Sequence, residues 1–342
     1  SSVALVSKKN KSLEIWSVPR RALQMTLTLD TQCDMLKYPC PVFTDNSSQT
    51  VAKVDSQHLA TWDIATGKET GRLRVCETDT SLVDFAISKA SDMLVVRYAN
   101  NTLRTWSLSS QQPLSSSYST NHWIRRMFLS TDGTRLATIA GGDSVIHIID
   151  PRDGKNVEML TGCETAPACV AFHPTMKYVG AATNDGRLHI WDSTRGSERL
   201  QSKHPSSLFS LKFSNRGDHL AFAGTHGVTV FETDSRRKVW EVSETLPSGE
   251  YLNIRGLPRL LHFDKTDQKL ACGLADGRVR MRSASEGVEQ SVINAHEGWV
   301  TSVEYSPDGK HLATSGSDHK IHLWSTDNSS RIISLDGHTD MV

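Results

Sequence analysis

The chain has 342 residues, 37% of them hydrophobic, and its 38 basic and 38 acidic side chains cancel to a formal net charge of zero. A dedicated nucleic-acid binder needs an excess or a patch of Lys and Arg, so we expect no nucleic-acid partner. No apolar run is long enough to span a membrane and no signal-peptide pattern opens the chain, so we expect no membrane association.

The six cysteines include no C-x-x-C pair and are too few for a disulfide framework in a chain of this length. They indicate small buried hydrophobic residues in a reducing compartment. The chain opens on Ser1 rather than Met, from which we expect a piece excised from a longer multidomain protein. These features predict a cytoplasmic location, with a nuclear location as the alternative.

A short β-type run that ends in an aromatic or equivalent residue recurs along the chain at intervals of roughly 40 to 50 residues. In chain order the runs end at Trp16, Trp62, Trp106, Ile149, Trp191, Phe231, Arg282 and Trp324. The eight units fill the chain, so we expect a single domain over residues 1–342. The chain opens on what aligns as a second strand of the first unit, at residues 3–6.

The last unit shows the internal pattern best. Residues 299–305 alternate apolar and polar side chains, as a strand with one buried face does. Residues 306–309 read Ser-Pro-Asp-Gly, in which Pro and Gly favour a turn. Further strands are predicted at 310–315, 320–324 and 331–335, so each unit is an antiparallel meander of four strands.

Helical periodicity is missing throughout, and a four-stranded meander cannot bury both of its faces alone. Neighbouring units must therefore stack, and radial stacking leaves only short protected edges, which is the arrangement of a β-propeller. We expect an all-β fold of eight four-stranded antiparallel blades. The alternative is seven blades plus a fragment of a neighbouring propeller.

The Trp-Asp pairs at Trp62 and Trp191, together with the whole of the last unit, resemble the WD40-repeat family. The resemblance implies a hydrogen-bonded structural cluster in the last unit, with Ser315 as an alternative to its threonine. The cluster residues are His296, Thr314, Asp318 and Trp324. In the fifth unit Cys163 occupies the position of the family's histidine.

Contact positions of the family lie at the start of each first strand and beside the second hairpin turn. The resemblance thus implies a binding rim at the channel mouth, formed by Trp123, Arg125, Asn184, Phe209, Leu257, Arg259, Trp299, Thr301 and Ser317. Trp and Arg are the side chains that dominate binding hot spots. We predict a non-catalytic scaffold that binds a protein or peptide, without cofactor or metal, as a monomeric domain of a larger assembly.

No nucleophile elbow, phosphate-binding loop or metal-ligand spacing occurs in the sequence. The alternative function is a propeller-based hydrolase or lyase, for which the candidate residues at the channel mouth are His122, Asp143 and His226. Two basic runs, at 19–21 and 236–238, are expected to be solvated loop charges, with an anion contact as the alternative. The Pro- and Gly-containing segment 243–258 is a long loop that either packs on its blade or contacts a partner.

Overall fold

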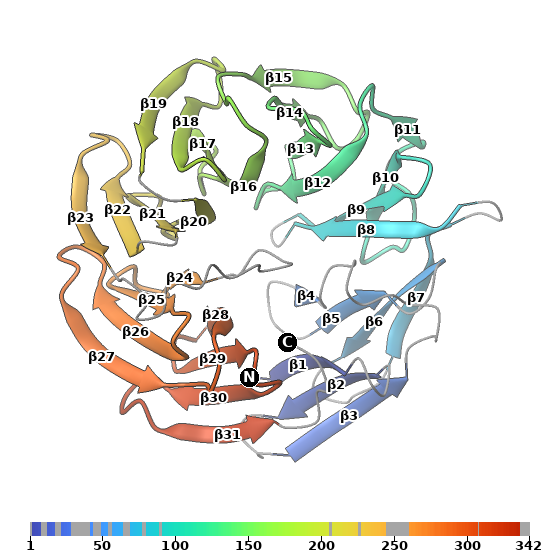
Figure 1. Ribbon diagram of the computed structural model, residues 1–342. Helices are drawn as coiled ribbons and strands as arrows, with labels where there is room; N and C mark the ends of the chain where they lie inside the picture. The colour runs from blue at the N-terminus through green and yellow to red at the C-terminus, as the bar shows by residue number, and fades with distance from the viewer. Residues whose placement is uncertain are drawn as a thin grey trace. The chain divides into compact units, whose positions relative to one another are not determined.

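A computed structural model describes most of the chain. The described residues are 2–7, 12–17, 22–28, 42–43, 49–53, 57–63, 69–76, 80–88, 91–204, 207–224, 227–243, 260–306 and 308–335. They form strands and connecting turns and contain no helix, and hence none able to cross a membrane. The strands build eight separate antiparallel sheets, one with three strands and seven with four (Figure 1).

We number the sheets as blades 1 to 8 in chain order. The chain divides into two compact units, and the first comprises Ser1–Gly141 and Ile146–Met159. Blade 1 consists of β1 (Ser2–Ser7), β2 (Ser12–Ser17) and β3 (Ala22–Thr28), and blade 2 of β4 (Val42–Phe43), β5 (Gln49–Lys53), β6 (His58–Asp63) and β7 (Glu69–Arg74). Blade 3 consists of β8 (Leu82–Ile87), β9 (Met93–Tyr98), β10 (Thr102–Ser107) and β11 (Tyr118–Ser119). Blade 4 consists of β12 (Ile124–Leu129), β13 (Leu136–Ala140), β14 (Ile146–Ile149) and β15 (Asn156–Leu160).

The second unit comprises Gly142–Val145 and Leu160–Val342. Blade 5 consists of β16 (Pro167–Phe172), β17 (Tyr178–Thr183), β18 (Arg187–Asp192) and β19 (Glu198–Lys203), and blade 6 of β20 (Leu208–Phe213), β21 (His219–Gly224), β22 (Gly227–Glu232) and β23 (Lys238–Ser243). Blade 7 consists of β24 (Leu261–Phe263), β25 (Lys269–Gly273), β26 (Arg278–Ser283) and β27 (Glu289–Asn294). Blade 8 consists of β28 (Val300–Tyr305), β29 (His311–Gly316), β30 (Ile321–Ser325) and β31 (Arg331–Leu335).

The predicted repeat is confirmed strand by strand. Each of the eight residues that ends a predicted run lies in the strand preceding the last strand of its sheet, from Trp16 in β2 to Trp324 in β30. The first sheet starts with β1, which pairs antiparallel with β2 and occupies the place of a second strand, as expected. Segment 337–342 lies outside the described residues.

The hydrophobic core consists of layers between successive sheets. In the first unit, Met93 and Val95 of blade 3 pack with Ile124, Leu136 and Ile149 of blade 4. In the second unit, separate clusters of the same kind join blades 5 and 6, blades 6 and 7, and blades 7 and 8. A meander thus buries its faces on its neighbours, which is why the repeat must be tandem.

Blade 7 carries an arginine where most other blades carry an aromatic residue. Arg282 is buried, and its guanidinium donates to the carbonyl oxygen of Gly287 at 3.1 Å and to Glu289 at 3.4 Å. Arg280, on the same strand, donates to the same carboxylate at 3.1 Å. Because a buried cation is tolerated only with such partners, this ion-pair group replaces the apolar filler of the other blades.

Candidate functional site

The first strands of five blades carry a β-bulge near their start. The pairing shifts by one residue between Leu82 and Asp84, Ile124 and Arg126, Pro167 and Cys169, Leu208 and Ser210, and Val300 and Ser302. Three predicted contact residues, Arg125, Phe209 and Thr301, are the extra residues of such bulges. A bulge re-aims a side chain out of the regular alternation of the strand, and bulges are over-represented beside functional sites.

Trp123, immediately before β12, is an exposed side chain on a fixed backbone. Its side chain is 61% exposed, more than any other large hydrophobic side chain among the described residues. The buried Asn101 side chain donates to the carbonyl of His122 at 2.7 Å and accepts from the amide of Ile124 at 2.9 Å. The amide of Gly141 donates to the carbonyl of Trp123 at 3.1 Å. The backbone on both sides of the indole is therefore held.

A buried ion pair in blade 3 supports the same segment. Arg97 donates to the carbonyl of Ile124 at 3.1 Å, and another nitrogen of its guanidinium lies 3.9 Å from a carboxylate oxygen of Asp84. Burial raises the pKa of Asp84 to about 6, although attraction to Arg97 and the amide of Phe85 opposes the rise. Blade 3 thus fixes the start of β12 through two side chains, Asn101 and Arg97.

Trp299, which the sequence aligns with Trp123, has different surroundings. It is half-buried, and its indole N–H is buried without a hydrogen-bond partner among the described residues. Its carbonyl accepts from the amide of Ser317 at 2.9 Å. The neighbouring Thr301 hydroxyl lies 2.7 Å from that of Ser315. The two tryptophans are therefore not equivalent, and only Trp123 is largely open to solvent.

Two other predicted rim residues lie in second hairpin turns. Asn184 is exposed beside the second hairpin turn of blade 5, and Ser317 is half-buried in the corresponding turn of blade 8. Leu257, Arg259 and the rest of segment 244–259 lie outside the described residues, as do His226 and the basic run 19–21. Of Phe209 only the place in the strand is described.

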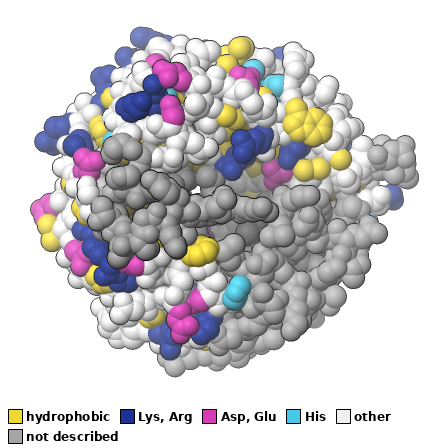
Figure 2. All heavy atoms as spheres, viewed as in Figure 1, with side chains coloured by type: hydrophobic (Ala, Val, Ile, Leu, Met, Phe, Trp, Pro, Cys, Tyr) yellow, Lys and Arg dark blue, Asp and Glu magenta, His cyan; other side chains and the backbone are white. Residues whose placement is uncertain are grey.

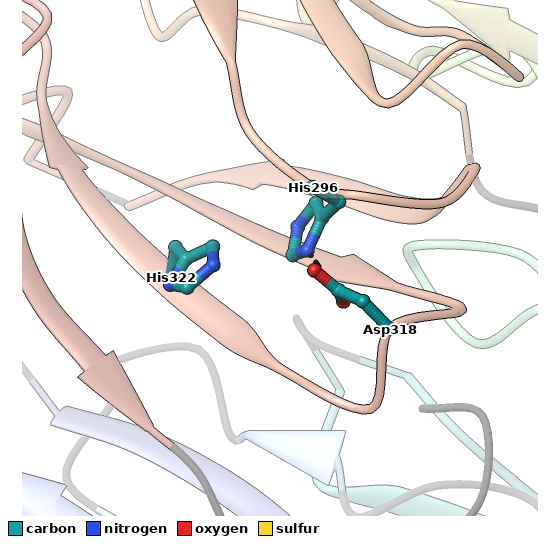
Figure 3. Close-up of side chains that lie close together, drawn as sticks. All are labelled: His296, Asp318 and His322. Atoms are coloured by element: carbon teal, nitrogen blue, oxygen red, sulfur yellow. Dashed lines mark hydrogen bonds and ion pairs between the residues drawn. The ribbon is translucent and has the colours of Figure 1, made fainter.

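A chain of hydrogen bonds joins the four residues of the predicted structural cluster in blade 8. The indole N–H of Trp324 donates to Thr314 Oγ1 at 3.0 Å, and that hydroxyl lies 2.9 Å from His296 Nε2. His296 Nδ1 lies 2.9 Å from Asp318 Oδ1, as Figure 3 shows. Since a carboxylate only accepts, the imidazole proton is on Nδ1, and Nε2 accepts from the Thr314 hydroxyl. We call these four residues the blade 8 cluster.

Two segments of the chain match the family model described as the WD domain, G-beta repeat: residues 154–192 and 287–325. The second segment contains the whole blade 8 cluster. The chain therefore contains repeats of the WD40 family.

Curated relatives match different shares of the chain. The nuclear distribution protein nudF of Aspergillus niger is 28% identical over 52% of this chain and 39% of its own length. Telomerase protein component 1 of Mus musculus is 29% identical over 48% of this chain and 6% of its own length. The target of rapamycin complex subunit wat1 of Schizosaccharomyces pombe is 24% identical over 70% of this chain and 76% of its own length. The chain thus spans less than half the length of the first two.

Solved structures show the fold. A chain of the computationally designed Ika8 protein covers 90% of this chain and 88% of its own length, with a TM-score of 0.70 and 17% identity. A chain of the mitotic checkpoint complex covers 86% and 88%, with a TM-score of 0.65 and 17% identity. The predicted β-propeller of four-stranded antiparallel blades is confirmed.

Electrostatics fix the charge states within the blade 8 cluster. Burial lowers the pKa of His296, against the attraction of Asp318. Burial alone would raise the pKa of Asp318, but the amide of Glu297 and the attraction of His296 outweigh it and lower that pKa. Near neutral pH the imidazole is therefore neutral and the carboxylate charged.

We expect acid to destabilise the protein partly through His296. Below about pH 6.5 the unfolded chain takes up a proton that the folded imidazole resists, so the free energy of unfolding falls as the pH falls. Replacing His296 with Gln should lower stability near neutral pH and flatten its decline between about pH 7.5 and about pH 5.5. Urea unfolding at both pH values measures this.

The comparison of wild type with His296→Gln isolates one group among several. The buried His173 and the half-buried His204, whose pKa values are also lowered by burial, are present in both proteins and cancel. So does Asp84, whose raised pKa has the opposite effect because the folded state then holds the extra proton. An equal decline with acid in both proteins would contradict the role given to His296.

A group of three side chains in blade 8 has the composition of a metal site. His296, Asp318 and His322 each offer one ligand atom, and these atoms lie within 4.8 Å of one another (Figure 3). However, Asp318 and Thr314 already occupy both ring nitrogens of His296, so an ion would have to break one of these hydrogen bonds. The imidazoles of His296 and His322 stack with centroids 4.8 Å apart. The arrangement is explained by hydrogen bonding and stacking, and we assign it no metal.

Blade 4 repeats part of this cluster, which the sequence reading overlooked. His122 Nε2 lies 2.9 Å from Thr138 Oγ1, and the imidazole stacks on that of His147 with centroids 4.0 Å apart. His122 was a candidate for the alternative catalytic function, and so was Asp143, whose carboxylate accepts from the amide of Val145 at 3.0 Å. Both side chains thus have local structural contacts. The signal in the sequence is a threonine that follows each histidine, in the second strand of the blade: Thr138 after His122 and Thr314 after His296.

In blade 5, Cys163 occupies the position that a histidine has in blades 4 and 8. Burial raises the pKa of this thiol to about 12, so it remains protonated. The fully buried Trp191 donates its indole N–H to the carbonyl of Thr161 at 3.0 Å instead of to a threonine hydroxyl. Thr183 donates to Asp185. The loss of histidine therefore changes the acceptor of the tryptophan but leaves the ring in place.

Charged side chains of both signs are interspersed over the described part of the face drawn in Figure 2. In the basic run 236–238, Arg236 donates to the carbonyl of Arg199 at 3.0 Å, and Lys238 lies 2.6 Å from Glu241. The run is thus engaged with neighbouring groups. On the described part of this face the charges do not form a continuous positive surface of the kind that a nucleic-acid backbone requires.

Proposed function

We propose that this WD40 chain is a non-catalytic scaffold that binds a protein partner through Trp123 and Arg125 of blade 4. The observation that carries the proposal is the combination at Trp123 of a 61% exposed indole and a backbone fixed on both sides. Exposing an indole to water is unfavourable, so covering it with a partner lowers the free energy. Because the backbone that carries it is already fixed, little backbone conformational entropy is lost on binding. These are the properties of an anchor residue at an interface.

The names of two relatives support a role in assemblies. One is a subunit of the target of rapamycin complex and another a nuclear distribution protein. A single propeller domain, present as a monomer within a larger assembly in the cytoplasm or nucleus, is part of the proposal. Three described rim residues of the second unit, Asn184, Trp299 and Ser317, are secondary candidates, because of these three only Asn184 is exposed.

Affinity capture from a cell lysate tests the proposal. We expect wild type and Trp299→Ala to retain the same partner and Trp123→Ala to lose it, because truncating a hot-spot residue costs about 2 kcal/mol or more, about 30-fold in Kd. Each variant is first checked for unchanged thermal unfolding. Because Trp123 is exposed, its replacement is not expected to change the unfolding temperature. Full retention of every partner by folded Trp123→Ala would refute the proposed site.

A further inference from the structure

The side chains around Trp123 also indicate what kind of segment binds there. Arg125 is exposed and has no hydrogen bond or ion pair within the described part of the chain. It is the extra residue of the β12 bulge, two positions after Trp123. By contrast, the buried Arg97 is paired with Asp84 and bonded to the carbonyl of Ile124. The start of β12 therefore presents one unpaired cation two residues after one exposed indole.

Space for a ligand exists beside this pair. Gly141 is exposed, and a side-chain carbon added to it would meet no atom within 4 Å. Its amide is bonded to the carbonyl of Trp123, so this open stretch of hairpin adjoins the tryptophan. A chain laid over Gly141 would pass next to the backbone of Trp123 without displacing a side chain.

We propose that this site, which rests on the function proposed above, binds an extended peptide segment carrying a carboxylate next to an aromatic or branched aliphatic residue. An arginine covered by a partner must receive a counter-charge from it, and the guanidinium fits a carboxylate through two parallel hydrogen bonds. The indole takes the apolar side chain.

A nucleic-acid strand would use the same two side-chain types, stacking on Trp123 and pairing a phosphate with Arg125. Such a strand needs several phosphates neutralised, whereas the chain has a net charge of zero and its charges are interspersed on the described part of the face in Figure 2. The observations therefore favour a peptide.

Asn101 acts as a positioning residue for this site. Its carboxamide joins the carbonyl before Trp123 to the amide after it, at 2.7 and 2.9 Å, and its own backbone has a positive φ of 65°. It reaches this place from the turn between β9 and β10 of blade 3. Loss of the carboxamide should leave the peptide preference unchanged while weakening the binding, because the backbone that carries the indole is then no longer held in advance.

The experiment selects binders from a random linear peptide library displayed on phage, using the folded chain as bait. Wild type should enrich peptides with Asp or Glu beside an apolar residue, and Arg125→Lys should keep that preference. Arg125→Glu should enrich Lys or Arg instead and weaken the best acidic peptide at least about tenfold. Asn101→Ala should weaken the same peptide several-fold, whereas Asn100→Ala, at the exposed neighbouring position, should not.

Each remaining outcome overturns the inference in a recognisable way. Selection that depends on Trp123 but favours neutral or basic peptides, or that Arg125→Glu leaves unchanged, refutes the acidic partner and leaves the scaffold proposal standing. Selection unaffected by Trp123→Ala refutes both. Failure to select any peptide, or tighter binding of a fluorescent oligothymidine than of the best peptide, also overturns the peptide inference.

Discussion

Replacing Trp191 with Ala is expected to lower the free energy of unfolding by about 3–5 kcal/mol, the usual cost of deleting a buried tryptophan from a core. Trp191 is 0% exposed and stacks on the imidazole of His189 with centroids 5.4 Å apart. Its removal leaves a cavity between strands that are already fully paired, so the surroundings cannot collapse into it. Urea unfolding followed by circular dichroism measures the loss.

Substitution with Phe separates packing from hydrogen bonding in this prediction. Trp191→Phe loses the bond to the Thr161 carbonyl, whereas the buried indole N–H of Trp106 has no hydrogen-bond partner among the described residues. Trp191→Phe should therefore cost about 1 kcal/mol more than Trp106→Phe. A Trp191→Ala variant within about 1 kcal/mol of wild type would contradict the packing described for blade 5.

The second large effect is expected at Gly277, in the turn between β25 and β26. Its φ is +83°, and a Cβ there would lie 2.0 Å from the carbonyl oxygen of His296 and 2.6 Å from that of Gly298. These atoms are backbone and cannot rotate away, and the carbonyl of Gly277 itself accepts from the amide of His296 at 2.9 Å. Gly277→Ala should thus separate blades 7 and 8 locally and cost several kcal/mol, at least about 3 kcal/mol.

Gly309→Ala is the matched control. Gly309 also follows an aspartate in a hairpin turn and has a φ of +74°, but a Cβ there would meet only Lys265 Cβ at 3.8 Å. This variant should pay only the backbone strain of about 1–2 kcal/mol. Thermal unfolding of the two variants compares them directly, and equal losses would show that the contact with the His296 carbonyl carries no energy.

The strands and their order could be predicted because each depends on residues close together in the sequence. The Ser-Pro-Asp-Gly turn at 306–309 and the alternation at 299–305 predict the hairpin of β28 and β29 without tertiary information. The blade 8 cluster could be assigned by resemblance for a related reason, since its four side chains lie within one repeat and its first hydrogen bond joins His296 and Asp318.

The environment of the candidate site could not be predicted, because it comes from a different repeat. Asn101 lies in blade 3 yet holds the backbone on both sides of Trp123 in blade 4, and no spacing rule connects them. The aligned Trp123 and Trp299 differ because His122 directly precedes Trp123, whereas two residues separate His296 from Trp299. That difference in loop length is visible in the sequence, but its effect on exposure is not.

Site-specific photo-crosslinking at the start of β12 tests the central claim most directly. A photoreactive amino acid is placed at the exposed Asn121, two residues before Trp123, and in a separate protein at the exposed Arg152. The strand register puts Arg152 at the opposite end of the blade 4 sheet, because Ile149 pairs with Leu136 and Ile124 with Ala140. The account predicts that a protein partner crosslinks at position 121 and not at position 152. Crosslinking at position 152 alone, or equally at both, would contradict it.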